Sequence, residues 1–276
     1  MKIGILTFHF VHNYGAVLQA YALQEYLRDE GHDVQIINNR QDKCFHPDLK
    51  KPSLKNYLHK NPKLILREIS LTKIRIQRSN NFEKFINNKL ILSSKYPSNK
   101  IPSDYDMYIV GSDQIWNYKI TKGFIGNYFC DFSFEKSSKK YVSYAASVGT
   151  GTLNKEQVEY IKSNLSRFDA ISIREQDMVN IFQRILPDKE IFQVLDQTLL
   201  VDRSIWNGLT EKRMMPGEYI VVYQVHEVPS AIELAEHLAK ELNAKILILN
   251  AWHSLNFRDN KYQTASPEDF LNYIRY

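Results

Sequence analysis

The sequence predicts an α/β fold built on parallel sheets, because short apolar strands alternate with amphipathic helices along the 276 residues. The run KIGILTF at residues 2–8 has strand character, and the segment 15–30 carries apolar residues at helical spacing. Gly31 stands where a helix-ending glycine is expected, and residues 33–38 form the next strand. Together they predict a βαβ unit with parallel strands and a right-handed crossover.

The same alternation continues through the middle of the chain. Further short apolar strands are predicted at three places: 107–113, 140–147 and 170–175. A helix over 154–168 separates the last two strands. Residues 202–217 mix charge, proline and glycine without a clean period, so we place a linker there.

A second βαβ unit follows the linker. Residues 218–225 and 244–250 read as strands, and 229–243 reads as the helix between them. The last predicted helix covers 266–276, with Ser266 as N-cap and Pro267 at its first position. Two strands and two helices do not bury both faces of a sheet, so we expect either that this second lobe is incomplete or that another chain completes it.

Composition indicates a folded, globular protein. Hydrophobic residues make up 43% and charged residues 24% of the chain, which is too apolar for intrinsic disorder. No segment reaches the roughly 18 apolar residues of a membrane helix, and the N-terminus lacks the long apolar region of a signal peptide. We therefore expect a cytoplasmic location. Cys44 and Cys130 are too few for a disulfide framework or a zinc site, so no metal is predicted.

The net charge of +5 is concentrated in residues 50–90, which hold eleven Lys or Arg against Glu68 and Glu83. Apolar residues recur there at roughly helical spacing, so a solvated face of amphipathic helices explains the charge. Contact with anionic headgroups at the inner face of the membrane, or with an acidic glycan, is the alternative. No nucleic-acid-binding motif accompanies the run, so a nucleic-acid partner is not expected.

The first candidate site lies between the first strand and the first helix. Ligands of open α/β sheets bind where strands end and helices begin, which makes four neighbouring residues candidates for binding: His12, Asn13, Tyr14 and Gly15. The pattern is not the glycine fingerprint of dinucleotide-binding proteins. Asn13 as a helix cap and Gly15 as a turn residue are the structural alternatives.

The second candidate site lies at the end of the strand predicted over 107–113. Asp113 is a candidate to bind or deprotonate a substrate hydroxyl, and Trp116 is a candidate to stack on a sugar ring. A capping Asp and a core Trp are the alternatives. The neighbouring candidates for substrate binding are Gly111, Ser112, Gln114 and Asn117.

Three later positions complete the set of candidates. Ser147 ends a strand of small residues, which permits close approach by a ligand or by a neighbouring backbone. Arg174 ends another strand and suits a carboxylate or phosphate, although it could simply pair with Glu175 or with a neighbouring acid. Asp196 follows a short apolar run and reads as a turn-forming residue. No hydrolase, zinc or P-loop motif is present.

These segments together resemble the polysaccharide pyruvyl transferases. The similar stretches occur in the same order: HNYGAVLQAYAL (12–23), YDMYIVGSDQIWN (105–117), YAASVG (144–149), SIREQ (172–176), VLDQTLL (194–200) and SPEDFL (266–271). One departure is Gln197, where the family more often has Pro. A second is the lack of the family's Ser-Phe-His-Gly motif, whose His is thought to be catalytic, so we expect this chain to be inactive alone.

The resemblance implies a glycosyltransferase-B-like architecture of two Rossmann-like lobes. Residues 1–205 would form the first lobe, and 206–276 the linker and the start of the second. The implied reaction moves a pyruvyl group from phosphoenolpyruvate, a donor substrate and not a cofactor, onto hydroxyls of a sugar or lipid-linked glycan as a ketal. Arg174 would then hold the donor, and Asp113 would act on the acceptor hydroxyl.

Two other functions fit the same pattern. The fold also hosts nucleotide-sugar glycosyltransferases, and a truncated chain could serve as a catalytically inactive binding module. The acceptor glycan, its linkage and the oligomeric state are left open by the sequence.

Overall fold

The computed structural model describes residues 1–41, 62–149, 152–226, 228–250 and 264–276, with the side chains of 62–71 and of Asn250 left out. The described chain groups into two compact units by its internal contacts. Unit 1 comprises residues 1–11, 15–46 and 86–202, and unit 2 comprises 12–14, 47–85 and 203–276. No helix in the described ranges is long and apolar enough to cross a membrane.

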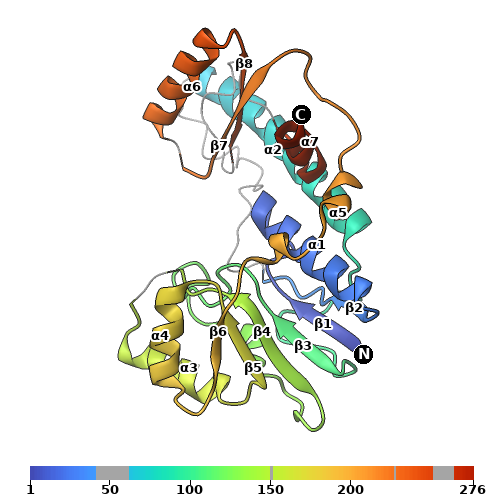
Figure 1. Ribbon diagram of the computed structural model, residues 1–276, viewed down its shortest axis with the longest axis vertical. Coiled ribbons are helices and arrows are strands. Elements are labelled where there is room, and N and C mark those ends of the chain that lie inside the picture. Colours follow the sequence, from blue (N-terminus) through green and yellow to red (C-terminus); the bar gives the residue numbers. More distant parts are fainter. Residues whose placement is uncertain (42–61, 150–151, 227, 251–263) are drawn as a thin grey trace. The chain divides into compact units, whose positions relative to one another are not determined.

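Unit 1 is built on a six-stranded parallel sheet with the strand order β2-β1-β3-β4-β5-β6 (Figure 1). Its strands are β1 (Lys2–Leu6), β2 (Asp33–Ile36), β3 (Met107–Val110), β4 (Lys140–Ala146), β5 (Ala170–Ile173) and β6 (Ile191–Gln193). Because every pairing is parallel, all six strands end at the same edge of the sheet. Loops that follow these strands therefore meet at one edge.

Helices connect the strands of unit 1. They are α1 (Tyr14–Asp29), α3 (Lys155–Leu165) and α4 (Gln176–Ile185), with short 3-10 turns η2 (Gly126–Phe129) and η3 (Gln197–Leu199). Helix α4 packs on β5 and β6 through the face that carries Met178, Phe182 and Ile185, which are spaced four and three residues apart. A single aromatic-rich core, which includes Tyr108 and Trp116, underlies the sheet.

Unit 2 contains a two-stranded parallel sheet of β7 (Tyr219–Gln224) and β8 (Lys245–Asn250). Its helices are α5 (Arg203–Asn207), α6 (Pro229–Glu241) and α7 (Pro267–Arg275), joined by α2 (Pro62–Lys89) up to Phe85. Ser266 accepts the backbone N–H of Asp269 and Pro267 opens α7, so the predicted start of this helix is confirmed.

The predicted strands and helices are confirmed to within a few residues at their ends. Helix α4, strand β6 and helix α5, the last within the predicted linker at 202–217, were not predicted. Within the basic stretch, 62–89 form one helix, while 50–61 lie outside the described residues. The predicted division into a first domain of 1–205 and a linker with the start of a second domain over 206–276 stays a prediction. The glycosyltransferase-B-like arrangement of two lobes stays a prediction.

Candidate active site at the carboxyl edge of the six-stranded sheet

Strand β3 runs directly into the loop that holds Asp113. Gly111 has a φ of 128°, and a Cβ at this position would clash with the backbone oxygen of Tyr144. Glycine is therefore required for the loop to lie this close to β4. Asp113 itself has a φ of 66°, a left-handed conformation that Asp tolerates better than most residues. The loop thus presents Asp113 at the edge where β3 ends.

The end of β4 fixes this loop by two backbone hydrogen bonds. Ser147 donates its N–H to the carbonyl oxygen of Asp113 at 3.1 Å, and Trp116 donates its N–H to the carbonyl oxygen of Ser147 at 3.1 Å. The Ser147 hydroxyl accepts the N–H of Gly149 at 3.0 Å. Ser147 is fully buried, so it positions the Asp113 loop and does not itself face a ligand.

The carboxyl of Asp113 has a raised pKa. Burial is the main cause, because it disfavours the charged form, and the nearby carboxylates of Asp196 and Glu175 act in the same direction. A backbone N–H from Gln114, 2.7 Å from Oδ1, and the charge of Arg174 oppose the shift without cancelling it. A partly buried carboxyl with a raised pKa is suited to proton transfer.

Arg174 follows β5 and carries the positive charge of the site. Its Nε donates to Oε1 of Glu175 at 3.1 Å, and its Nη1 donates to Oδ2 of Asp196 at 3.3 Å. Burial disfavours the charged guanidinium, but the surrounding carboxylates outweigh it and leave the pKa of Arg174 raised. Nη2 has no hydrogen-bonding partner among the residues that the structure describes, and the side chain is 31% exposed.

Asp196 connects the loops after β3, β5 and β6. Its Oδ2 accepts both from Arg174 and from the hydroxyl of Ser112, the latter at 3.2 Å. Its Oδ1 accepts the backbone N–H and the hydroxyl of Thr198 and so caps the turn η3. The sequence indicated a turn-forming Asp, which is confirmed, but its contact with Arg174 was missed.

A buried glutamine in α1 supports the site from beneath. Gln19 accepts the backbone N–H of Ser112 at 3.2 Å and donates to the hydroxyl of Thr7 at 2.9 Å. The amide of Gln197, where the family more often has Pro, donates to the same Gln19 oxygen. Sequence reasoning missed Gln19 and Thr7, although a glutamine on the buried face of an apolar helix was a usable signal.

The structure corrects the expected role of Trp116. Its side chain is 1% exposed, and its ring stacks with Phe129 at 5.5 Å and with Phe182 at 5.8 Å. The indole N–H donates to the backbone oxygen of Tyr128 at 2.7 Å. Because core rings stack on it, Trp116 is the core residue of the alternative reading, and only its small exposed part reaches a neighbouring pocket.

Gln114 and Asn117 hold the loop in shape. The Asn117 amide donates to Oε1 of Gln114 at 2.5 Å, and its oxygen accepts the backbone N–H groups of Lys119 and Ile120. Gly149 lies against both amides, and any side chain there would clash with them. These contacts make both residues structural supports of the Asp113 loop.

Three of the four candidates in the first motif belong to unit 2. His12 Nε2 lies 3.3 Å from Oε1 of Glu83 and its ring stacks on Phe82. Tyr14 is 1% exposed, stacks on Phe270 at 4.4 Å and donates its hydroxyl to the backbone oxygen of Ala265. Tyr14 is thus a core residue of unit 2, which does not fit a ligand contact.

Asn13 is partly exposed in unit 2, and Gly15 is exposed in unit 1. Whether either residue, or His12, meets the donor or the sugar stays a prediction. No cluster of three or more potential metal ligands occurs in the described ranges.

The sequence as a whole matches the family model of polysaccharide pyruvyl transferase over residues 13–276. This match covers nearly the whole chain, including both units. The chain belongs to the polysaccharide pyruvyl transferase family.

The family implies a transferase that acts on a sugar or polysaccharide acceptor. No curated protein matched this chain. Apart from His12, all of the sequence-predicted site residues fall within the matched range, as do Asp196 and Gln19, whereas Thr7 lies before it.

Proposed function

We propose that this polysaccharide pyruvyl transferase takes phosphoenolpyruvate as donor and forms a cyclic pyruvate ketal on two hydroxyls of a sugar. Both hydroxyl oxygens bond to C2 of the donor, and the C2–O bond to phosphate breaks. Of the two hydroxyl protons, one ends on C3, which becomes a methyl group, and the other leaves with the phosphate. The reaction needs no redox partner.

The observation that carries the proposal is the placement of Arg174. Phosphoenolpyruvate has a carboxylate and a phosphate, and a guanidinium suits such planar or tetrahedral anions better than any other side chain. The Nε and Nη1 groups are held by Glu175 and Asp196, which fixes the plane of the guanidinium. Nη2 is then directed by that plane and serves as the donor to the substrate anion.

Asp113 is the candidate to receive the proton of the acceptor hydroxyl. Because its pKa is raised, its carboxylate is a stronger base than an ordinary Asp, and it lies in a partly dehydrated loop. Its charge also interacts with that of Arg174, so the donor-binding and proton-accepting groups belong to one cluster. In this proposal the hydroxyl is deprotonated as its oxygen bonds to C2.

The test is product analysis with the full chain, both alone and extended by the family's Ser-Phe-His-Gly motif, because we expect the chain alone to be inactive. Phosphoenolpyruvate and a panel of hexose glycosides would be incubated with the protein, and the sugars examined by mass spectrometry and NMR. The proposal expects a gain in mass equal to pyruvic acid less one water, a new methyl singlet and one equivalent of phosphate. Transfer of a sugar from a nucleotide sugar, or transfer of pyruvyl without the methyl group of a ketal, would contradict it.

A further inference from the structure

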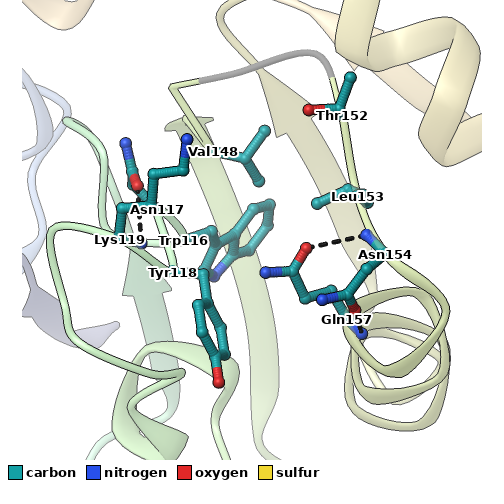
Figure 2. Close-up of a pocket in the computed structure, with 9 residues that line it drawn as sticks. All are labelled: Trp116, Asn117, Tyr118, Lys119, Val148, Thr152, Leu153, Asn154 and Gln157. Carbon is teal, nitrogen blue, oxygen red and sulfur yellow. Dashed lines mark hydrogen bonds between the residues drawn. The ribbon is translucent and has the colours of Figure 1, made fainter.

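A pocket lies beside the Asp113 loop in unit 1 (Figure 2). Its volume is about 350 Å³, within the range of small-molecule sites. The loop after β3 forms one wall, the end of β4 the back, and the start of α3 the opposite wall. Residues 116–119, which follow Asp113 in this loop, therefore line the pocket.

The base of the pocket is apolar and one rim is aromatic. Trp116, Val148 and Leu153 line it, and the first two are almost fully buried. Tyr118, two residues beyond Trp116, is 45% exposed and packs edge-on with Phe124 at 5.1 Å between ring centroids. An exposed, supported tyrosine ring is the kind of surface on which the C–H face of a sugar ring rests.

The opposite wall offers two amide donors with fixed orientation. Oε1 of Gln157 accepts the backbone N–H of Asn154, and Oδ1 of Asn154 accepts the backbone N–H of Gln157, both in the capping box of α3. Both side-chain oxygens are thereby engaged with the helix. The two NH₂ groups consequently face away from the helix and toward the pocket, as Figure 2 shows.

The charge of the lining selects the chemistry of the ligand. Asn117, Lys119 and Thr152 complete the polar lining, and no Asp or Glu is among the described residues that line the pocket. The amide of Asn117 bonds to Gln114 and to backbone N–H groups of its own loop. Apart from the hydroxyls of Tyr118 and Thr152, the lining side-chain groups that are not bonded within the protein are hydrogen-bond donors, namely the NH₂ groups of Asn154 and Gln157 and the ammonium of Lys119. A molecule rich in acceptor oxygens fits such a lining, and Lys119 favours one that also carries an anionic group.

We propose that this pocket binds a pyranose unit of the glycan acceptor, with Tyr118 against its ring, Asn154 and Gln157 donating to its oxygens, and Lys119 favouring an acidic sugar. This inference rests on the proposed function only in identifying the bound pyranose as part of the acceptor. Binding of the pyranose itself is a property of the pocket and is measured without turnover.

The test is direct binding of four methyl glycosides (of glucose, galactose, mannose and glucuronic acid) to the full chain by NMR. The side-chain NH₂ signals of Asn154 and Gln157 are the reporters. We expect at least one glycoside to shift both signals, with the glucuronide bound more tightly than the glucoside. The substitution Lys119→Gln should remove that preference.

Two isosteric substitutions test the donors without breaking the helix. Asn154→Asp and Gln157→Glu keep the capping oxygens, because Asp is a good N-cap and Glu is the usual partner in a capping box. Each replaces an NH₂ donor by a carboxylate oxygen, so affinity should fall about tenfold with no loss of thermal stability. Asn180→Asp, which adds the same charge on an exposed position of α4, should leave affinity unchanged.

Two substitutions of Tyr118 test the role of the aromatic rim. Tyr118→Leu should weaken binding and Tyr118→Phe should retain it. No binding by any glycoside, or binding that the Asn154, Gln157 and Tyr118 variants leave unchanged, would overturn the assignment. Phosphoenolpyruvate binding, measured in parallel, separates the two hypotheses, since glycoside binding without donor binding would contradict the proposed function and leave the pocket in place.

Discussion

Arg174 and the hydroxyl of Ser112 share one carboxylate oxygen, Oδ2 of Asp196, at 3.3 and 3.2 Å respectively. The loops after β3, β5 and β6 are therefore joined through a single atom at the carboxyl edge of the sheet. Asp196 does not need to touch a substrate to matter, because it orients the guanidinium and contributes to the raised pKa of Asp113. It is best described as a positioning residue.

Replacing Asp196 with Asn tests this positioning role. The substitution keeps an oxygen for Thr198, replaces the oxygen that accepts from Ser112 and Arg174 by an NH₂ group and removes the negative charge, so the pKa of Asp113 should fall. If Asp113 acts as a base, the acid limb of the pH–rate profile moves to lower pH. An acid limb that stays in place, with activity reduced at all pH values alike, would indicate that Asp196 has only a structural role.

Asp113→Asn should separate activity from stability. Asn preserves an acceptor for the N–H of Gln114 and tolerates the φ of 66°, but it cannot accept a proton. We expect kcat to fall by roughly 10²–10⁴-fold, the usual contribution of a general base. Unaltered turnover by this variant would remove Asp113 from the mechanism.

The same substitution has a signed effect on stability. Because the folded pKa of Asp113 lies above its unfolded value, the folded state binds the proton more tightly, and stability falls as pH rises through the folded pKa. Asn does not ionise, so the variant does not lose stability in this way as pH rises. Its free energy of unfolding at neutral pH, measured with urea, should be at least as large as that of the native chain. A variant markedly less stable at neutral pH would show that the buried charge is well compensated.

Gly111→Ala should disrupt the Asp113 loop. The added Cβ meets the backbone oxygen of Tyr144, and the φ of 128° is unfavourable for alanine. Gly123→Ala is the matched control, since Gly123 has a φ of 117° and nothing within 4 Å of an added Cβ. Both carry backbone strain of about 1–3 kcal/mol, and Gly111→Ala should lose clearly more free energy of unfolding. Equal losses would mean that the loop adjusts freely.

Trp116→Ala should reduce stability strongly. A buried Trp that is truncated to Ala costs about 3–5 kcal/mol, whereas the exposed neighbour Tyr118→Ala should stay within about 0.5 kcal/mol. Denaturant unfolding of the two variants measures the difference. A mild effect at Trp116 would contradict its place in the core.

Much of the fold could be predicted from local patterns. The βαβ units can be predicted from apolar strands and from helical spacing of apolar residues, which are visible within short stretches of sequence. The start of α7 can be predicted from Ser266 and Pro267, because serine is a favoured N-cap and proline a favoured first residue of a helix. Arg174 and Asp113 could be nominated because polar residues at parallel strand ends converge at one edge. The sequence did not show which aromatic near that edge is exposed, since Trp116 and Tyr118 differ only in what packs around them.

The rest depends on long-range contacts. Tyr14 follows the first strand closely, yet its hydroxyl bonds to Ala265 and its ring stacks on Phe270, which groups residues 12–14 with unit 2. Gln19 is indistinguishable in the sequence from an ordinary helical glutamine, and its role depends on contacts with the loops after β3 and β6 in the folded chain. Neither set of contacts produces a periodic or regularly spaced pattern in the sequence, so neither could be predicted from one sequence.

Calorimetric titration of phosphoenolpyruvate into the native chain and into Arg174→Lys tests the central claim most directly. Lysine keeps the charge but loses the fixed fork of the guanidinium, so affinity should fall about ten- to a hundredfold. Arg167→Lys, at a partly buried arginine that contacts Asn164 and Asp131, is the control and should bind like the native chain. Equal affinity of the native and Arg174→Lys proteins, or no binding by the native protein, would contradict the account of Arg174 as the donor-binding residue.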